Sequence, residues 1–130
     1  MAKTKNAKRN KLMVVDDDVE LLEELKEILT SQGYELTCSS CGETASKLAI
    51  KKRPDLIVMD INLGKITGFE VSQQLLKSTV TKNIPVIAIT GYGMNLKNNM
   101  TEQNENIKHM LLKPFNPPEL VKRIKALSLP

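Results

Sequence analysis

Short apolar runs alternate along this chain with segments whose apolar residues recur at helical spacing. The clearest runs, 56–59 and 86–89, are unbroken and are bounded by polar or turn-forming residues. Runs of this kind are typical of strands that are buried on both faces of a parallel sheet. The pattern predicts strands at 12–15, 34–38, 56–60, 86–89 and 107–112.

The segments between these runs predict amphipathic helices. The first carries apolar residues from Leu21 to Leu29 and ends at Gly33, a residue common at helix C-termini. Further helices are expected over 42–53 and 69–78, and a last one follows a capping asparagine, Asn116. Alternating strands and helices predict an α/β fold in which helices cover both faces of a doubly wound, parallel, five-stranded sheet.

Polar residues stand where four of the predicted strands end. Right-handed crossovers bring the C-terminal ends of parallel strands to one edge of the sheet, where ligands of open α/β folds bind. Any one of these residues could simply cap a helix or form a turn. Together they predict one crevice that contains three carboxylates, a hydroxyl and an ammonium group: Asp16, Asp17, Asp60, Thr90 and Lys113.

This set of side chains suits phosphoryl transfer. Clustered carboxylates repel one another and favour Mg²⁺, which binds one or two carboxylates, waters and phosphate oxygens. Beside such a cation, Asp60 is a competent nucleophile towards phosphorus. Thr90 and Lys113 can offer a hydrogen bond and a positive charge to the transferred oxygens. The residues therefore predict a site that accepts a phosphoryl group.

Composition narrows the class of protein. The length of 130 residues suits one domain, and no apolar run approaches the ~18 residues of a membrane span. Residues 1–11 hold five of the 19 basic residues and no acidic one, which leaves 14 basic against 15 acidic residues, a net charge of −1, for the rest. We expect a basic flexible leader at 1–10, a domain at 11–130, a cytoplasmic location and no binding to membranes or nucleic acid.

The cysteines and the histidine have less specific patterns. Cys38 and Cys41 form a CxxC pair, but the first ends a predicted strand and the second lies in a turn, so we expect unrelated packing or loop cysteines. One such pair is also weak evidence for zinc. His109 lies within a predicted strand, which favours a structural role.

Four motifs, in this order, resemble the signature blocks of the receiver domain of two-component response regulators. They occupy residues 14–18, 55–62, 85–92 and 113–115, and the resemblance runs from about Lys11 to Leu127. It implies a flavodoxin-like (βα)5 fold with strand order 2-1-3-4-5. We expect either a free-standing regulator or the receiver of a hybrid histidine kinase.

The resemblance also implies roles for individual residues. Asp60 would be the phosphoacceptor, supplied by a histidine kinase or a histidine phosphotransfer protein. Asp17 would bind Mg²⁺ directly and Asp16 through water, while Asp60 and the main-chain carbonyl of Asn62 complete the protein ligands. Such a domain is not a turnover enzyme, but it assists its own phosphorylation and dephosphorylation and switches the binding of a downstream protein.

By the same resemblance, Thr90 would bind a phosphoryl oxygen and Lys113 would pair with the phosphoryl group. Three departures concern the readout. Gly64 replaces a common proline, which suggests a looser loop. Met110 occupies the switch position, where relatives have an aromatic residue whose ring swings inward. The asparagine-rich segment 94–106 predicts a short or mobile helix. We expect intact phosphorylation chemistry and a non-standard readout.

Three alternatives remain at this point. The first is a pseudo-receiver that serves as a protein-interaction scaffold, although the acidic set is complete. The second is a Mg²⁺-dependent phosphohydrolase of the haloacid dehalogenase type, which would require an aspartate where Asn62 stands. The third, flavin binding on the same fold, would require a phosphate loop rich in serine and threonine after the first strand.

Overall fold

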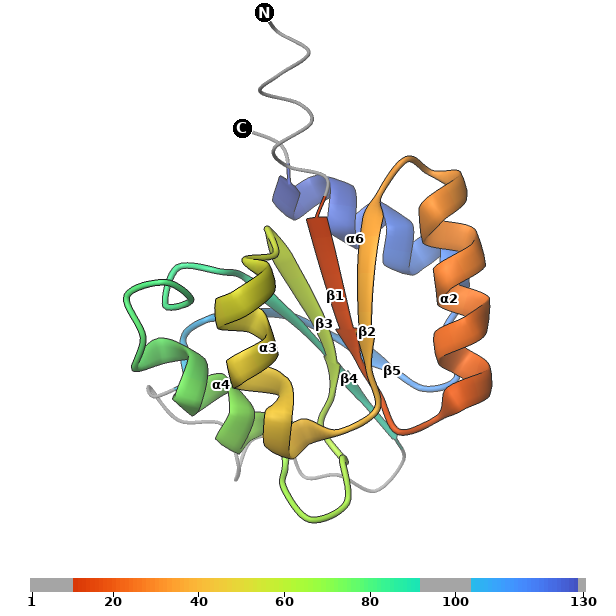
Figure 1. The fold of residues 1–130 in the computed structure, drawn as a ribbon. Helices are drawn as coiled ribbons and strands as arrows, with labels where there is room; N and C mark the ends of the chain where they lie inside the picture. The colour runs from red at the N-terminus through yellow and green to blue at the C-terminus, as the bar shows by residue number, and fades with distance from the viewer. Residues whose placement is uncertain (1–10, 92–103, 129–130) are drawn as a thin grey trace, which may run out of the picture.

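The computed structural model describes residues 11–91 and 104–128, and in them the chain forms one parallel sheet covered by helices on both faces (Figure 1). In chain order the elements are β1 (Lys11–Val15), α2 (Val19–Ser31), β2 (Glu35–Ser39), the 3₁₀ turn η1 (Gly42–Thr44), α3 (Ala45–Lys52), β3 (Leu56–Asp60), α4 (Gly68–Leu76), β4 (Val86–Thr90), β5 (Ile107–Leu112) and α6 (Pro117–Ser128).

The strands pair in the order β2-β1-β3-β4-β5, and every pairing is parallel. This confirms the doubly wound, flavodoxin-like sheet. Each predicted strand is present within about two residues of its expected bounds, and the predicted helix 42–53 divides into η1 and α3. The leader 1–10 and most of the predicted helix 94–106 lie outside the described residues.

Two apolar layers hold the helices against the sheet. Residues of β1, β3 and β4 alternate between them: Met13, Ile57 and Ala88 belong to the layer beneath α3 and α4, whereas neighbours such as Val14 and Val58 belong to the layer beneath α2 and α6. Because the central strands are buried on both faces, their sequences are almost continuously apolar. None of the helices among the described residues is long and apolar enough to cross a membrane.

Helix α4 begins with a capping box that directly follows the loop after β3. The Thr67 hydroxyl accepts a hydrogen bond from the Glu70 backbone N–H at 3.2 Å, and the Glu70 carboxylate accepts one from the Thr67 N–H at 3.2 Å. The pattern Thr-x-x-Glu is visible in the sequence, and it fixes the first turn of the helix.

Gly68, the first residue of α4, lies against the backbone of the end of β3. Its N–H donates to the Ile61 carbonyl at 2.7 Å. A Cβ at this position would lie 2.7 Å from the Asp60 carbonyl oxygen and 3.0 Å from the Ile61 Cα. These neighbours are backbone atoms with little freedom to move. The absence of a side chain at Gly68 therefore sets how closely α4 approaches Asp60.

We predict that Gly68→Ala lowers the free energy of unfolding by about 1–3 kcal/mol, because the new methyl group forces α4 away from β3. Urea unfolding measures the change. Gly91→Ala is the matched control: a Cβ at Gly91 meets no atom of the described residues within 4 Å, so its effect should stay within about 0.5 kcal/mol. Equal losses in the two variants would contradict the close-approach argument.

Candidate functional site

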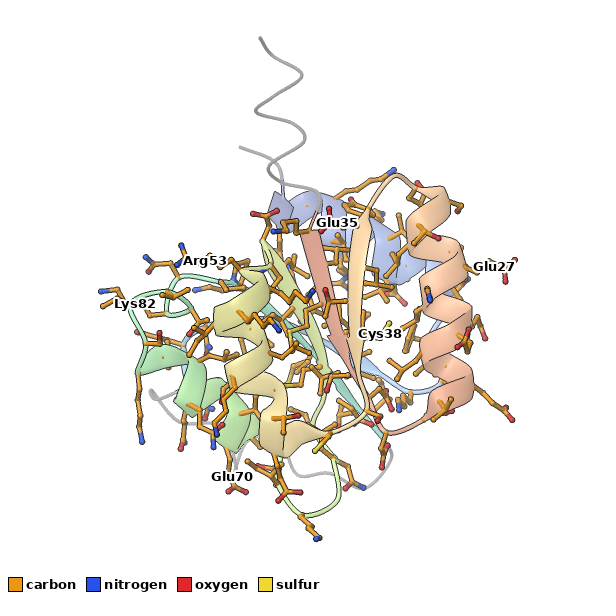
Figure 2. All side chains as sticks on the ribbon, viewed as in Figure 1. Glu27, Glu35, Cys38, Arg53, Glu70 and Lys82 are labelled. Carbon is orange, nitrogen blue, oxygen red and sulfur yellow. The ribbon has the colours of Figure 1, made fainter. Side chains whose placement is uncertain are left out.

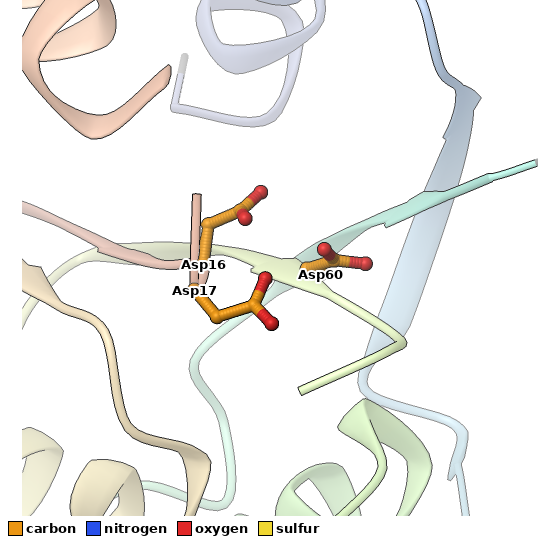
Figure 3. A group of neighbouring side chains, drawn as sticks. All are labelled: Asp16, Asp17 and Asp60. Atoms are coloured by element: carbon orange, nitrogen blue, oxygen red, sulfur yellow. The ribbon is translucent and has the colours of Figure 1, made fainter. Parts of the chain in front are cut away.

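Three aspartates gather where β1 and β3 end (Figure 3). Asp16 and Asp17 directly follow β1, and Asp60 is the last residue of β3, the strand paired with β1. Each offers a carboxylate oxygen, and these three oxygens lie within 4.8 Å of one another. Asp16 and Asp60 are buried, whereas Asp17 is exposed. The sheet thus brings together all three predicted carboxylates.

Lys113 supplies positive charge between two of these aspartates. It directly follows β5, and its backbone N–H donates to the Thr90 carbonyl at 2.7 Å. Its Nζ lies 3.0 Å from Asp16 Oδ2 and 3.0 Å from Asp60 Oδ2. Burial alone would lower the pKa of Lys113, but its contacts with Asp16 and Asp60 outweigh this effect and raise the pKa. The ammonium group therefore stays charged at neutral pH.

Both carboxylate oxygens of Asp60 have donors. Oδ1 accepts a hydrogen bond from the Asn62 backbone N–H at 3.0 Å, and Oδ2 accepts one from Lys113 Nζ at 3.0 Å. Asp60 is only 5% exposed, so these two contacts fix the orientation of its carboxylate at the mouth of the site. The bond to Asn62 also turns the chain directly after the strand.

Asp16 is less completely satisfied. Its Oδ1 accepts from the Asp18 N–H at 2.9 Å, but its buried Oδ2 has no hydrogen-bond partner among the described residues, only the ionic contact with Lys113. Burial raises the pKa of Asp16, and the charge of Asp60 adds to the rise, while the Asp18 N–H and Lys113 oppose it. A buried carboxylate oxygen that has no hydrogen bond and lies beside two further carboxylates fits a hard divalent cation such as Mg²⁺.

Thr90 and Asn62, the remaining predicted site residues, flank this group. Thr90 is the last residue of β4 and is 2% exposed; its hydroxyl lies 3.4 Å from the Gly91 carbonyl oxygen, a long hydrogen bond. Asn62 pairs with Thr67 in an isolated antiparallel bridge. The backbone of Asn62 is thereby held beside Asp60, and its carbonyl as a metal ligand stays a prediction.

Comparisons with known proteins agree with this geometry. A family model described as "Response regulator receiver domain" matches residues 12–125. The chain belongs to the response regulator receiver family. It is a phosphoacceptor signalling domain, a class of protein that is not usually counted among enzymes. No observation favours the scaffold or phosphohydrolase alternatives.

Individual relatives give the extent of the likeness. The receiver is 31% identical to the "Polar-differentiation response regulator DivK" of Brucella anthropi over 115 residues, which cover 88% of this chain and 93% of that protein. It is 32% identical to the "Probable transcriptional regulator ycf27" of Cyanophora paradoxa over 119 residues, which cover 92% of this chain but 48% of that protein. The chain spans about half the length of several curated relatives that it matches.

The fold has close counterparts among solved structures. A CheY-like response regulator receiver domain protein from Methanospirillum hungatei superposes with a TM-score of 0.82 at 27% identity, covering 92% of this chain and 93% of that one. The agreement extends over nearly the whole receiver and supports the sheet order described above.

The loop between β3 and α4 contains contacts that the sequence motifs did not indicate. Leu63 is buried and Ile66 packs against the same apolar layer, while Gly42 lies directly beneath both: a Cβ there would come within 2.8 Å of each side chain. Gly64, at φ 87°, forms the turn between them. The apolar residues Leu63 and Ile66, each between polar or glycine neighbours, were the available signal. Leu63 and Ile66 thus hold in place the loop that the glycine at position 64 had led us to expect to be looser.

The residues with less specific patterns lie away from the carboxylates. Cys38 is on the edge strand β2, on the side of α2 (Figure 2), Cys41 is in the following loop, and both are exposed free thiols. Partial burial raises the pKa of Cys38, which lowers its thiolate fraction and makes it less reactive. His109 Nδ1 lies 3.4 Å from an Arg123 guanidinium nitrogen, and Met110 packs against the layer beneath α3 and α4.

We predict that Asp16→Asn raises the free energy of unfolding by about 1 kcal/mol without Mg²⁺, because it removes a buried and incompletely paired charge while Lys113 keeps Asp60. The same change should abolish the stabilisation by Mg²⁺, which for the wild type is about 2.7 kcal/mol when Mg²⁺ exceeds its Kd about 100-fold. Thermal unfolding with and without MgCl₂ measures both effects.

The exposed neighbour provides the control. Asp17→Asn should also lose the stabilisation by Mg²⁺, yet change the stability of the metal-free protein by less than about 0.5 kcal/mol, since surface substitutions have small effects. An Asp16→Asn variant that is less stable than the wild type, or that still gains full stability from Mg²⁺, would rule out this account of the buried oxygen.

Proposed function

We propose that Asp60 accepts a phosphoryl group from a phosphohistidine on a kinase or a histidine phosphotransfer protein. A carboxylate oxygen of Asp60 forms a bond to phosphorus while the bond between phosphorus and the imidazole nitrogen breaks, and the released imidazole takes a proton from solvent. The observation that carries the proposal is the position of Asp60, which lies beside two further carboxylates and within 3.0 Å of the Lys113 ammonium.

Mg²⁺ is the cofactor that this donor set fits. The carboxylates of Asp16, Asp17 and Asp60, with the Asn62 carbonyl, would hold it, Asp16 through water. When bound, the ion would neutralise the clustered charge and draw the oxygens of the phosphoryl group towards Asp60. The buried Oδ2 of Asp16, which has an ionic contact with Lys113 but no hydrogen bond among the described residues, supports this assignment.

Lys113 and Thr90 would act on the transferred group. The Lys113 ammonium, which contacts Asp60 Oδ2, would pair with a phosphoryl oxygen once that carboxylate has become an acyl phosphate. Among the described residues the Thr90 hydroxyl has one long bond, to the Gly91 carbonyl, which leaves it able to turn towards a phosphoryl oxygen. By orienting the phosphoryl group, these residues would assist both phosphorylation of Asp60 and its later hydrolysis.

The partners follow from this chemistry. A phosphohistidine protein would supply the phosphoryl group, and a downstream protein would bind the switched form of the domain. The chain spans about half the length of several curated relatives. The binding of a downstream protein is therefore proposed for this domain together with any longer protein that contains it. We place the reaction in the cytoplasm, where phosphohistidine donors of this class meet their receivers.

We predict that acetyl phosphate with Mg²⁺ adds one phosphoryl group to the wild type and none to Asp60→Asn, because the amide oxygen is a poor nucleophile. Intact-protein mass spectrometry measures the addition. The matched control is Asp55→Asn: Asp55 lies at the opposite end of β3, where its carboxylate accepts from the Lys11 N–H at 3.0 Å. That variant should be phosphorylated like the wild type, and an unmodified wild type would refute the proposal.

A second prediction concerns the response to phosphorylation. Lys113→Ala should still accept the phosphoryl group, but its change in amide hydrogen exchange across β5 should shrink at least about fivefold, because the charge that senses the new group is gone. Lys108→Ala, an exposed position on the same strand, should respond like the wild type. A full response in Lys113→Ala would exclude Lys113 as the sensor.

A further inference from the structure

Three buried polar side chains connect α4 to the residues that precede β5. Ser72 and Asn104 are 0% exposed and Asn106 is 3% exposed. The Ser72 hydroxyl donates to Asn106 Oδ1 at 2.5 Å and accepts from Asn104 Nδ2 at 3.2 Å. Asn106 Nδ2 donates back to the Ser72 carbonyl at 3.1 Å, and Asn104 Nδ2 also donates to the Phe69 carbonyl at 3.0 Å. We call this group the amide–hydroxyl network.

The network lies one helical turn from the candidate phosphoacceptor. Gly68 packs on the backbone of Asp60, and Ser72 follows four residues later on the same helix. On the other side, the Asn106 carbonyl accepts from the Val86 N–H at the start of β4, and Asn106 leads directly into β5. Strand β5 ends beside Lys113, whose ammonium returns to Asp60. The network is therefore connected to Asp60 in two ways, through Gly68 of α4 and through β5 and Lys113.

Hydrogen bonding in this network is directional, which distinguishes it from the surrounding apolar contacts. The Ser72 hydroxyl uses its donor and one acceptor position, and both N–H bonds of the Asn104 amide have acceptors. A satisfied buried network specifies one arrangement, because any shift leaves costly unpaired groups. Met110, the residue at the usual switch position, is by contrast a flexible side chain that can adapt to several arrangements.

We propose that Ser72, Asn104 and Asn106 are positioning residues that couple the state of Asp60 to the start of β5. When Lys113 follows the phosphoryl group, β5 moves with it, and the amide–hydroxyl network makes α4 and residues 104–106 respond together. The inference rests on the proposed phosphorylation of Asp60. It gives the signal a route that does not depend on an aromatic residue at Met110.

The test compares Ser72→Ala with Thr81→Val, a matched control. Thr81 is also 0% exposed, and its hydroxyl donates to the α4 carbonyl of Leu75 at 2.6 Å, outside the network. Each variant removes one buried hydroxyl: the Ser72 hydroxyl connects α4 to Asn104 and Asn106, whereas the Thr81 hydroxyl connects the segment after α4 back to that helix. Each is phosphorylated with acetyl phosphate and Mg²⁺, incorporation is measured by mass, and amide hydrogen exchange is followed at Val86 and along β5.

In the wild type and in Thr81→Val, phosphorylation should change these exchange rates at least about fivefold, whereas in phosphorylated Ser72→Ala the change should be below about twofold. If Ser72→Ala does not fold, Ser72→Cys keeps the size of the side chain but bonds weakly, so its response should fall at least about twofold below the wild type.

A phosphorylated Ser72→Ala with a wild-type response would overturn the inference while leaving the proposed function intact. So would an equal loss of response in Thr81→Val, because the effect would then come from loosening α4 in general. A wild type that takes up no phosphoryl group would overturn the proposed function and this inference together.

Discussion

Repulsion among three carboxylates is the constraint on which this molecule depends. Parallel strands have their C-terminal ends at one edge of the sheet. Here the ends of β1 and β3 place carboxylate oxygens of Asp16, Asp17 and Asp60 within 4.8 Å of one another. Burial of two of them removes the water that would screen their charge. In the part of the chain that the structure describes, one ammonium group, that of Lys113, contacts both buried acids, so the three carboxylates keep a negative excess that favours a further cation.

The rest of the fold holds these groups at their positions. The central strands are buried on both faces, which leaves little freedom for their ends to separate. The loop after Asp60 is fixed by Leu63 and Ile66 over Gly42, and α4 is capped by Thr67 and Glu70 directly behind it. Rigid support of this kind suits a site whose reaction requires an oriented carboxylate rather than a mobile one.

Much of this arrangement could be predicted from the sequence, because strand burial and strand-end chemistry are local signals. Apolar runs and one alternating segment predicted the five strands, and polar residues at the ends of four of them predicted the members of the site. Contacts between segments distant in sequence could not be predicted in the same way. The close approach of Gly68 to Asp60 depends on where α4 lies, which no single segment specifies.

Asparagine content alone does not indicate what an individual asparagine does in the fold. The segment 94–106 predicts a poor helix, since asparagine competes with helical hydrogen bonds. Two of its asparagines, Asn104 and Asn106, are instead buried and bonded to Ser72, a use that depends on a partner about 30 residues earlier in the chain. An asparagine can weaken a helix or form buried hydrogen bonds, and only its tertiary surroundings decide which of the two it does.

The spacing of Gly68 and Ser72 restricts how this helix can vary among related chains. One residue inserted between them would rotate Ser72 by about 100° about the axis of α4 and turn its hydroxyl away from Asn106. An insertion in the loop before Thr67 leaves that angular relation unchanged. Length variation in relatives that keep the serine should therefore be confined to the loop, and the first turn of α4 should keep a constant number of residues.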